Sequence, residues 1–497
     1  MENVERVNDN NNVNSESERT YFDKVLAVAI EVGCGLLSCG CPVGRVELAV
    51  EYICNAYGAA AVSVATFPSM IMAGVRITDG SQVSQLKRVY SISNNFAKME
   101  AYNQLSRDIC SKKYPIDEAT ELVAKLRTSH NQSKLITALS AGIGAGAFTV
   151  FYGGNLIDAI PGALIGGLMA YLSCIFARLA FNSYARTFML SLIGGILSTF
   201  MCWLISLTGL TCHLSTVMMG TIMTVIPGLL MCNAIRDLFS GDTYSGTSEL
   251  LNAVLTTLAI VAGYGIPMMV STTFLEDVAI IKRTGLEDYL YRIISCFIGT
   301  TAFTVFFGGA YRRLIPSAIN AMVTFGIYLV MEYFVNDTLL NMLVATAVAA
   351  IISEIFARTI KAPAIIFFVP GVILFVPGRT LYLTVSNLIN KQWDTAMYYG
   401  GEMGKTLLGI VVGLIVITVL FNLISPTFHS RYLRKRVGNE KRILTEKEVL
   451  QSQSTVGGQS DCTTQGNLTQ PDVDNIVENN VENNLTQSQE NKENKGE

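Results

Sequence analysis

Proline–glycine pairs recur inside long apolar stretches of the chain, and they are the residues best suited to place polar chemistry there. Pro227-Gly228 lies in one stretch, and Pro370-Gly371 and Pro377-Gly378 lie in a later one. Proline removes a backbone donor and glycine relaxes a helix, so each pair predicts a helix break. Unwound backbone in corresponding helices can face a polar ligand. A simple kink without a ligand is the alternative.

Two arginines follow these pairs at the same spacing. Arg236 lies nine residues after Pro227, and Arg379 lies nine residues after Pro370. A guanidinium group can bind a carboxylate through two parallel hydrogen bonds, so this pair suits an amino-acid or dicarboxylate ligand. The spacing predicts that the arginines contact the ligand or act as paired gates. Anchoring at the membrane interface is the alternative.

Four acidic side chains are candidates for proton or ion coupling, because buried carboxylates are costly in a membrane and often mark ion pathways. They are Asp237, Glu249, Glu354 and Glu402. Glu249 and Glu402 are expected to open the last helix of each half, where an acid also favours the helix dipole. Glu354 lies one turn from Arg358, so a salt bridge within one helix is its alternative role.

The composition argues against metal, cofactor and nucleic-acid binding. The chain has 497 residues, with three histidines and eleven scattered cysteines. Because no CxxC spacing occurs, we expect no metal site and no cofactor. The net charge of −3 offers no basic surface for nucleic acid. Only 15% of residues are charged, against about 25% in soluble domains. The expected partners are a small-molecule substrate, protons, the lipid bilayer and further copies of the chain as a homo-oligomer.

An internal duplication organises the apolar part of the chain. Residues 147–161 read AFTVFYGGNLIDAIP, and residues 302–316 read AFTVFFGGAYRRLIP. Repeats of this kind are typical of secondary transporters, whose substrate site lies between the repeats. The duplication therefore predicts a carrier.

Charge-free runs predict ten membrane spans, five in each copy. An odd number per copy forces the two copies to enter the membrane from opposite sides, so the repeats are expected to be inverted. The distribution of lysine and arginine places both termini in the cytoplasm of a multi-pass protein of the cell membrane. The predicted fold class is a mainly α, polytopic membrane protein with ten transmembrane helices as two inverted five-helix repeats, preceded by a small soluble α+β domain.

The predicted domain boundaries follow from composition. A soluble domain is expected to carry helices at about 21–38, 43–57, 82–112 and 116–127, with strands at 62–66 and 70–77. Asn-, Gln- and Glu-rich ends predict disorder. The segments are a disordered tail (1–20), the cytoplasmic soluble domain (21–133), membrane repeat 1 (134–275), a connecting segment (276–291), membrane repeat 2 (292–430) and a disordered cytoplasmic tail (431–497).

Several motifs together resemble the threonine/serine exporter family. They are Gly44-Arg45-Val46-Glu47, Ala56-Tyr57-Gly58, the block Asn233-Ala-Ile-Arg-Asp-Leu, and the segment from Lys361-Ala-Pro-Ala through Pro377-Gly378. The resemblance covers about residues 22–425. It implies ten spans, a cytoplasmic N-terminal domain, and export of threonine and serine driven by the proton gradient. It also adds Asn233 to the candidate substrate or gating residues.

The leading hypothesis is therefore an exporter of small hydroxy amino acids by proton-coupled antiport, and not an enzyme. A dicarboxylate exporter is the alternative within the same class, because relatives that split these modules into two subunits export dicarboxylates such as succinate. An alternative of another class is a membrane-anchored hydrolase that uses the N-terminal domain, with Ser38, Cys39 or Cys41 as nucleophile and His130 as the one histidine of that domain.

Overall fold

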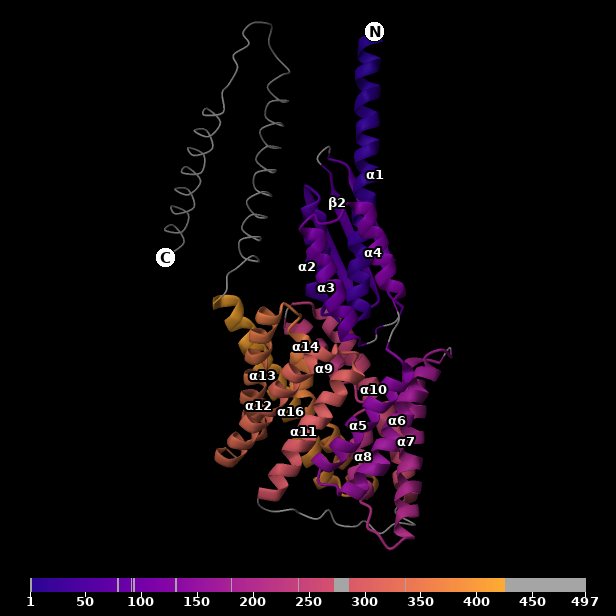
Figure 1. Ribbon diagram of the computed structural model, residues 1–497, viewed down its shortest axis with the longest axis vertical. Coiled ribbons are helices and arrows are strands. Elements are labelled where there is room, and N and C mark those ends of the chain that lie inside the picture. Colours follow the sequence, from indigo (N-terminus) through magenta and orange to yellow (C-terminus); the bar gives the residue numbers. More distant parts are fainter. Residues whose placement is uncertain are drawn as a thin grey trace, which may run out of the picture. The chain divides into compact units, whose positions relative to one another are not determined.

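The computed structural model describes residues 2–77, 80–90, 92, 94–129, 132–179, 181–239, 241–271, 286–335 and 337–424. The N-terminal part consists of α1 (Glu2–Ser38), α2 (Val43–Ala56), β1 (Ala61–Phe67), β2 (Met70–Arg76), β3 (Gln82–Arg88), α3 (Phe96–Cys110) and α4 (Ile116–Thr128) (Figure 1). Residues 272–285, which cover the end of predicted repeat 1 and most of the predicted connecting segment, lie outside the described residues, as do His130 and the predicted tail 431–497.

The N-terminal tail differs from the prediction. Residues 1–20 were expected to be disordered, whereas α1 already begins at Glu2. The physical reason is that no glycine or proline interrupts residues 2–20, so nothing in the sequence ends the helix before Ser38.

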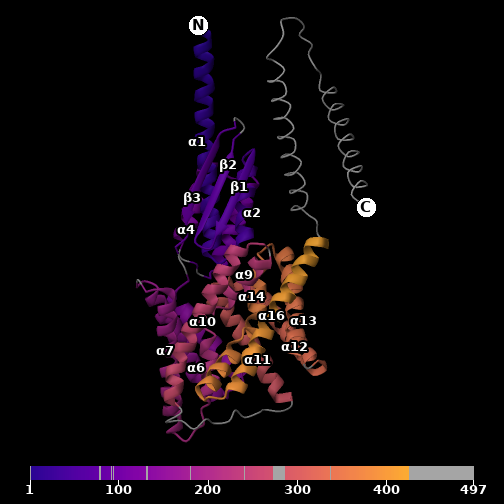
Figure 2. The same cartoon turned by 180° about the vertical axis from the view of Figure 1, so that it is seen from behind.

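A third strand is the second difference in this domain. The region 82–112 was predicted as one helix, but residues 82–88 form β3 and the helix α3 starts only at Phe96. β1, β2 and β3 form an antiparallel sheet in that order, with Val75 opposite Val83. Pairing with β3 satisfies the second edge of β2, and this long-range gain outweighs local helix propensity. Figure 2 shows this sheet from the other side.

The membrane part contains the two predicted copies of the repeat. Repeat 1 comprises α5 (Lys134–Phe151), α6 (Leu156–Phe176), α7 (Ser183–Ser206), the short pair α8 (Leu214–Ile222) and α9 (Gly228–Phe239), and α10 (Thr243–Ser271). Repeat 2 comprises α11 (Leu286–Phe306), α12 (Leu314–Phe334), α13 (Thr338–Ile360), the short pair α14 (Ile365–Val372) and α15 (Gly378–Ile389), and α16 (Trp393–Ile424).

Within the described residues, nine spans are long and apolar enough to cross a membrane, with α14 and α15 counted together. The α8–α9 pair stands at the corresponding place in repeat 1 and completes the series of ten. The α14–α15 span is 89% buried, whereas the other eight are 33–50% buried. The fourth span of repeat 2 is therefore central, whereas spans such as α5 and α6 expose apolar side chains, among them Leu139 and Ile160, as lipid-facing helices do.

Reciprocal contacts show that the two repeats run in opposite directions. A Cβ on Gly144 of α5 would meet the ring of Phe303 at 2.6 Å, and a Cβ on Gly299 of α11 would meet the ring of Phe148 at 3.4 Å. The two phenylalanines, which occupy the same position of the duplicated motif, also touch each other, with ring centroids 5.1 Å apart. Contacts in which residue i meets j′ and j meets i′ require a two-fold axis. That axis passes between α5 and α11.

Candidate functional site

Two helix breaks of the same form lie at the seam between the repeats. α9 begins directly after Pro227, and α15 begins directly after Pro377. The backbone hydrogen bonds agree as well. The amides of Gly228 and Gly378 donate to the carbonyl two residues earlier, at 2.9 and 2.6 Å. The break in repeat 2 is therefore at Pro377-Gly378.

This correspondence corrects the predicted one, in which Pro370-Gly371 matched Pro227-Gly228. Pro370 lies inside α14, which continues to Val372. Consequently Arg379 is the second residue of α15, whereas Arg236 lies near the end of α9, so the arginines do not occupy matching positions. Because the second copy contains two proline–glycine pairs close together, the sequence does not show which of them corresponds to Pro227-Gly228.

The two breaks also pack on each other reciprocally. A Cβ on Gly228 would meet Val376 Cγ2 at 2.9 Å, and a Cβ on Gly378 would meet Met223 Sδ at 2.9 Å and Ile226 Cδ1 at 3.7 Å. Each glycine thus faces the residues just before the proline of the other copy. A side chain at either position would force a neighbour to move, and Val376 is less able to move than Met223.

Pro370 has a different role, because its missing N–H leaves the carbonyl of Ile366 without its usual helical donor. Ser317 Oγ of α12 donates to that carbonyl at 3.4 Å, and Asn320 Nδ2 donates to the next one, Phe367 O, at 3.0 Å. Asn320 Nδ2 also donates to Ser353 Oγ of α13 at 3.0 Å. A buried polar network therefore holds α14 against α12 and α13. Its sequence signal is the helical spacing of Ser317, Asn320 and Thr324 within an apolar run.

A pocket opens on the other side of this network. It lies between α9, α13, α14 and α16, and its empty space, including the part open to the surroundings, is about 470 Å³. Its described polar lining comes from Asn233, Ser353, Glu354 and Thr418. The first residue of α14, Ile365, also lines it, so the positive end of that helix dipole lies at the pocket.

The structure separates the predicted site residues into groups. Asn233 and Glu354 both line the pocket, whereas Arg379 is exposed. The side chain of Arg236 lies outside the described part of the chain.

The predicted acids also differ in their surroundings. Glu354 faces Arg358 at 3.9 Å (Nε to Oε2), too long for a strong hydrogen bond. Glu402 accepts from Thr338 Oγ1 at 2.5 Å and from Lys405 Nζ at 2.8 Å. Glu249 is only 6% exposed, lies near Asp237, and its Oε2 has no hydrogen-bond partner among the described residues.

Glu249 and Glu402 were expected to open corresponding helices, and this expectation is wrong. α10 begins at Thr243 and α16 at Trp393, so both glutamates lie inside their helices. Gly263 packs against the backbone of Phe188 and Leu192, and Gly413 packs in the same way against Leu343 and Ala347. With Gly263 equivalent to Gly413, Glu402 of repeat 2 corresponds to Asn252 of repeat 1. It therefore lies about one helical turn away from the position that corresponds to Glu249.

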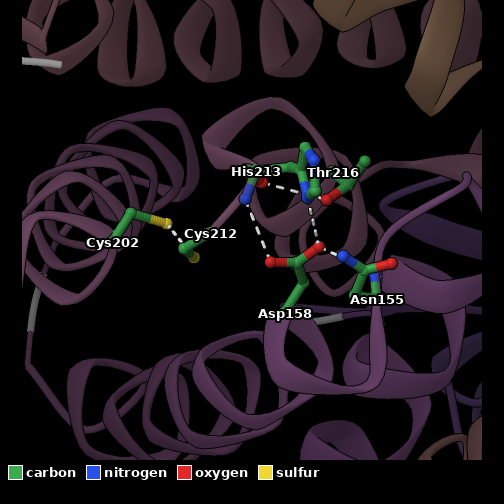
Figure 3. A network of polar contacts seen from close by, with 6 residues as sticks. All are labelled: Asn155, Asp158, Cys202, Cys212, His213 and Thr216. Atoms are coloured by element: carbon green, nitrogen blue, oxygen red, sulfur yellow. Dashed lines mark hydrogen bonds and ion pairs between the residues drawn. The ribbon is translucent and has the colours of Figure 1, made fainter. Parts of the chain in front are cut away.

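A buried Asp158–His213 pair was missed as a site by sequence reasoning. Asp158 is 0% and His213 1% exposed, and the imidazole Nδ1 lies 2.8 Å from Asp158 Oδ2 (Figure 3). The backbone amides of His213 and Asn155 donate to the same carboxylate at 3.0 and 2.7 Å. His213 Nε2 has no hydrogen-bond partner in the described structure. The two residues are 55 positions apart, so no local spacing in the sequence predicts the pair.

Two of the three candidate nucleophiles of the N-terminal domain, Ser38 and Cys39, lack activation. Burial raises the pKa of the Cys39 thiol to about 11, so little thiolate forms at neutral pH. Ser38 Oγ donates to the carbonyl of Gly35 at 2.9 Å within its own helix turn. Neither group has the environment of a catalytic nucleophile.

Comparisons with known proteins agree with this architecture. A family model for threonine/serine exporters matches residues 27–271, and a second, described as "Threonine/Serine exporter, ThrE", matches residues 292–420. Together they span both inverted copies. The chain belongs to the threonine/serine exporter family.

A curated relative of this family supports the assignment. A protein named threonine/serine exporter from Corynebacterium glutamicum is 21% identical over 382 residues, which cover 74% of this chain and 76% of the relative. No solved structure matches the chain. Membership in this exporter family makes the protein a multi-pass membrane transporter and points away from an enzyme.

Proposed function

We propose that this protein exports threonine and serine in exchange for protons. The observation that carries the proposal is the pocket between α9, α13, α14 and α16, which joins one carboxylate, hydroxyl and amide groups, and a helix N-terminus. A zwitterionic amino acid needs complementary charge at both ends. The Glu354 carboxylate suits the ammonium group, and the dipole of α14 suits the carboxylate.

The hydroxyl of the substrate has its own candidate partners. Asn233 and Ser353 line the same pocket, and the Asn233 amide already donates to the carbonyl of Gly40 at 3.2 Å, which fixes its orientation. A site that is built to hydrogen-bond a hydroxyl discriminates against analogues that lack it. This chemistry favours threonine and serine over valine and alanine.

A dicarboxylate fits the pocket less well. Of the described residues that line it, Glu354 is the charged one, and its carboxylate repels a ligand with two negative charges and no ammonium group. We therefore place the dicarboxylate exporter second.

The seam residues are proposed to control access. Pro227, Gly228, Pro377 and Gly378 form the packed breaks about which the two copies would rearrange, while Pro370 and Gly371 hold α14 on its polar network. Arg379 at the start of α15 is exposed and suits a gate. We keep Arg236 as the second gate on the basis of the sequence alone.

Proton coupling is proposed for the buried acids. Asp158 and His213 can hold one proton between Oδ2 and Nδ1 with no net charge. Glu249 beside Asp237 is the second candidate. Glu402 is the weakest, since both of its oxygens are engaged. We also propose that both termini face the cytoplasm, on the charge bias of the sequence.

Reconstituted vesicles test the proposal. Vesicles loaded with labelled threonine, serine or succinate should lose the two amino acids faster with the protein, and faster still with a proton gradient. Glu354→Gln removes the charge opposite the ammonium group and should raise the KM for threonine about tenfold, as expected for the loss of about 1.4 kcal/mol of binding. Glu332→Gln is the matched control, because Glu332 is exposed and does not line the pocket. Faster loss of succinate with no change for threonine and serine would refute the substrate assignment.

A further inference from the structure

The connection between α7 and α8 brings two cysteine sulfurs together. Cys202 lies in the last turns of α7 and Cys212 lies just before α8, and both side chains are buried. Their Sγ atoms are 2.7 Å apart and point toward each other beside the Asp158–His213 pair (Figure 3).

This separation fits a covalent bond better than the alternatives. An S–S bond is about 2.05 Å long, so a small rotation of one side chain would close the gap. Two thiolates that share a tetrahedral zinc at about 2.3 Å lie roughly 3.7 Å apart, which is much longer. The described residues also contain no group of three metal-ligating side chains, and His213 Nδ1 is already engaged by Asp158.

We propose that Cys202 and Cys212 form a disulfide that closes the α7–α8 connection and holds His213 on Asp158. Its formation needs an oxidant, which we assign to the class of disulfide-carrying thiol oxidoreductases. One cysteine thiolate attacks the oxidoreductase disulfide, and the second thiolate then displaces the oxidoreductase from the mixed disulfide. Two thiols are oxidised to one disulfide, and the oxidoreductase disulfide is reduced to two thiols.

The bond has a clear structural consequence. The connection between the two cysteines includes Gly209 in the left-handed region, at φ +78°, and it leads directly to His213. Both the backbone amide and Nδ1 of His213 must stay on the Asp158 carboxylate. Closing the connection covalently removes conformational freedom that would otherwise oppose this placement.

The disulfide also requires a particular side of the membrane. Asp158 and His213 lie at the end of α5 that is away from the N-terminal domain, since α5 starts right after that domain. In the inverted copy the equivalent end of α11 contacts the domain instead, where the Phe96 amide donates to Phe307 O at 2.9 Å. Disulfides persist in oxidising compartments, so the cysteine end must face away from the cytosol.

Differential alkylation of the full-length protein tests the proposal without any transport assay. Expressing cells are dissolved in denaturant with N-ethylmaleimide, then reduced, and the newly freed thiols receive an isotopically heavy maleimide before mass spectrometry. Cys202 and Cys212 should carry the heavy label, whereas the buried Cys39 and Cys296 should carry the light one. Light label on both Cys202 and Cys212 would overturn the proposal.

Serine variants give a second, independent readout. If the two sulfurs act as one bond, Cys202→Ser, Cys212→Ser and the double variant should lower the Tm by the same amount. Each single variant should leave the remaining cysteine with the light label. Cys296→Ser is the control, because it removes a buried sulfur from α11 and leaves both Cys202 and Cys212 in place. In this variant Cys202 and Cys212 should still carry the heavy label. Additive Tm shifts would contradict a bond between the two.

Discussion

At the scale of single residues, Glu47 shows how burial near other acids sets a pH response. Burial raises the pKa of Glu47, and the negative charges of Asp242, Glu51 and Asp237 raise it further, against the hydrogen bond from the Thr66 amide. A carboxyl whose pKa is higher in the folded state favours folding only while it is protonated. Its contribution is complete below the unfolded pKa of about 4.3 and is lost as pH rises through the folded value.

We therefore expect Glu47→Gln to stabilise the protein at pH 8 and to have almost no effect near pH 4. The carbonyl oxygen of the new amide side chain would still accept from the Thr66 amide, so only the ionisation is removed. Thermal unfolding of both proteins between pH 4 and pH 8 measures the difference. A variant that is less stable than the parent at pH 8, or a difference that ignores pH, would show that the acidic surroundings do not penalise Glu47.

At the scale of elements, the seam between α9 and α15 depends on close approach at glycine. A Cβ on Gly228 would lie 2.9 Å from Val376 Cγ2, and a β-branched side chain has little freedom to move aside. We expect Gly228→Ala to cost about 1–3 kcal/mol through overpacking, with a lower Tm in detergent and slower threonine flux.

Two other glycines serve as comparisons for that seam. Gly378→Ala should cost less, because the nearest atom is the flexible Met223 sulfur at 2.9 Å. Gly404→Ala in α16 meets no atom within 4 Å and should be neutral or stabilising by up to about 1 kcal/mol, from helix propensity. Equal melting temperatures for Gly228→Ala and Gly404→Ala would mean that the breaks do not pack as described.

At the scale of the whole compact unit, the N-terminal domain is attached to repeat 2 through a charged contact. Glu100 of α3 forms an ion pair with the buried Arg313. It forms a second ion pair with the exposed Arg312, whose Nη2 lies 3.2 Å from Glu100 Oε1. Arg313 stands at the position of the duplicated motif that Asp158 occupies in repeat 1. The same position of the motif thus carries opposite charges in the two copies. Asp158 pairs with His213, whereas Arg313 pairs with Glu100 of the soluble domain.

Glu100→Ala should loosen this attachment, because it leaves Arg313 buried without its counter-charge, at a cost of about 3 kcal/mol. The amides of Phe96 and Ala97, which donate to Phe307 O and Gly308 O, should then exchange with deuterium faster. Asp117→Ala is the control, since its pair with Lys24 is exposed on both sides and contributes little. Unchanged exchange at Phe96 and Ala97 in Glu100→Ala would indicate that backbone contacts alone hold the domain.

The class of protein, the doubled membrane unit and the family could be predicted from the sequence alone, because these features rest on local patterns. The motif around Gly153-Gly154 and Gly308-Gly309, and the apolar runs, are readable without any packing. Asn233 and Glu354 were singled out from the sequence as a substrate or gating residue and a proton-coupling residue, and both line the pocket; their roles stay predictions. Helix ends and the third strand depend on pairing and packing that local propensity does not contain.

Which proline–glycine pair forms the break, and which side chains meet, depends on tertiary packing. Pro370 and Pro377 carry the same local signal, and the choice depends on whether α12 supplies a donor such as Ser317 to the freed carbonyl. Asp158 with His213, and Cys202 with Cys212, are joined by helix rotation and by the α7–α8 connection. A hydropathy pattern records which segments enter the membrane, but the side chains that face each other depend on how whole helices turn about their axes.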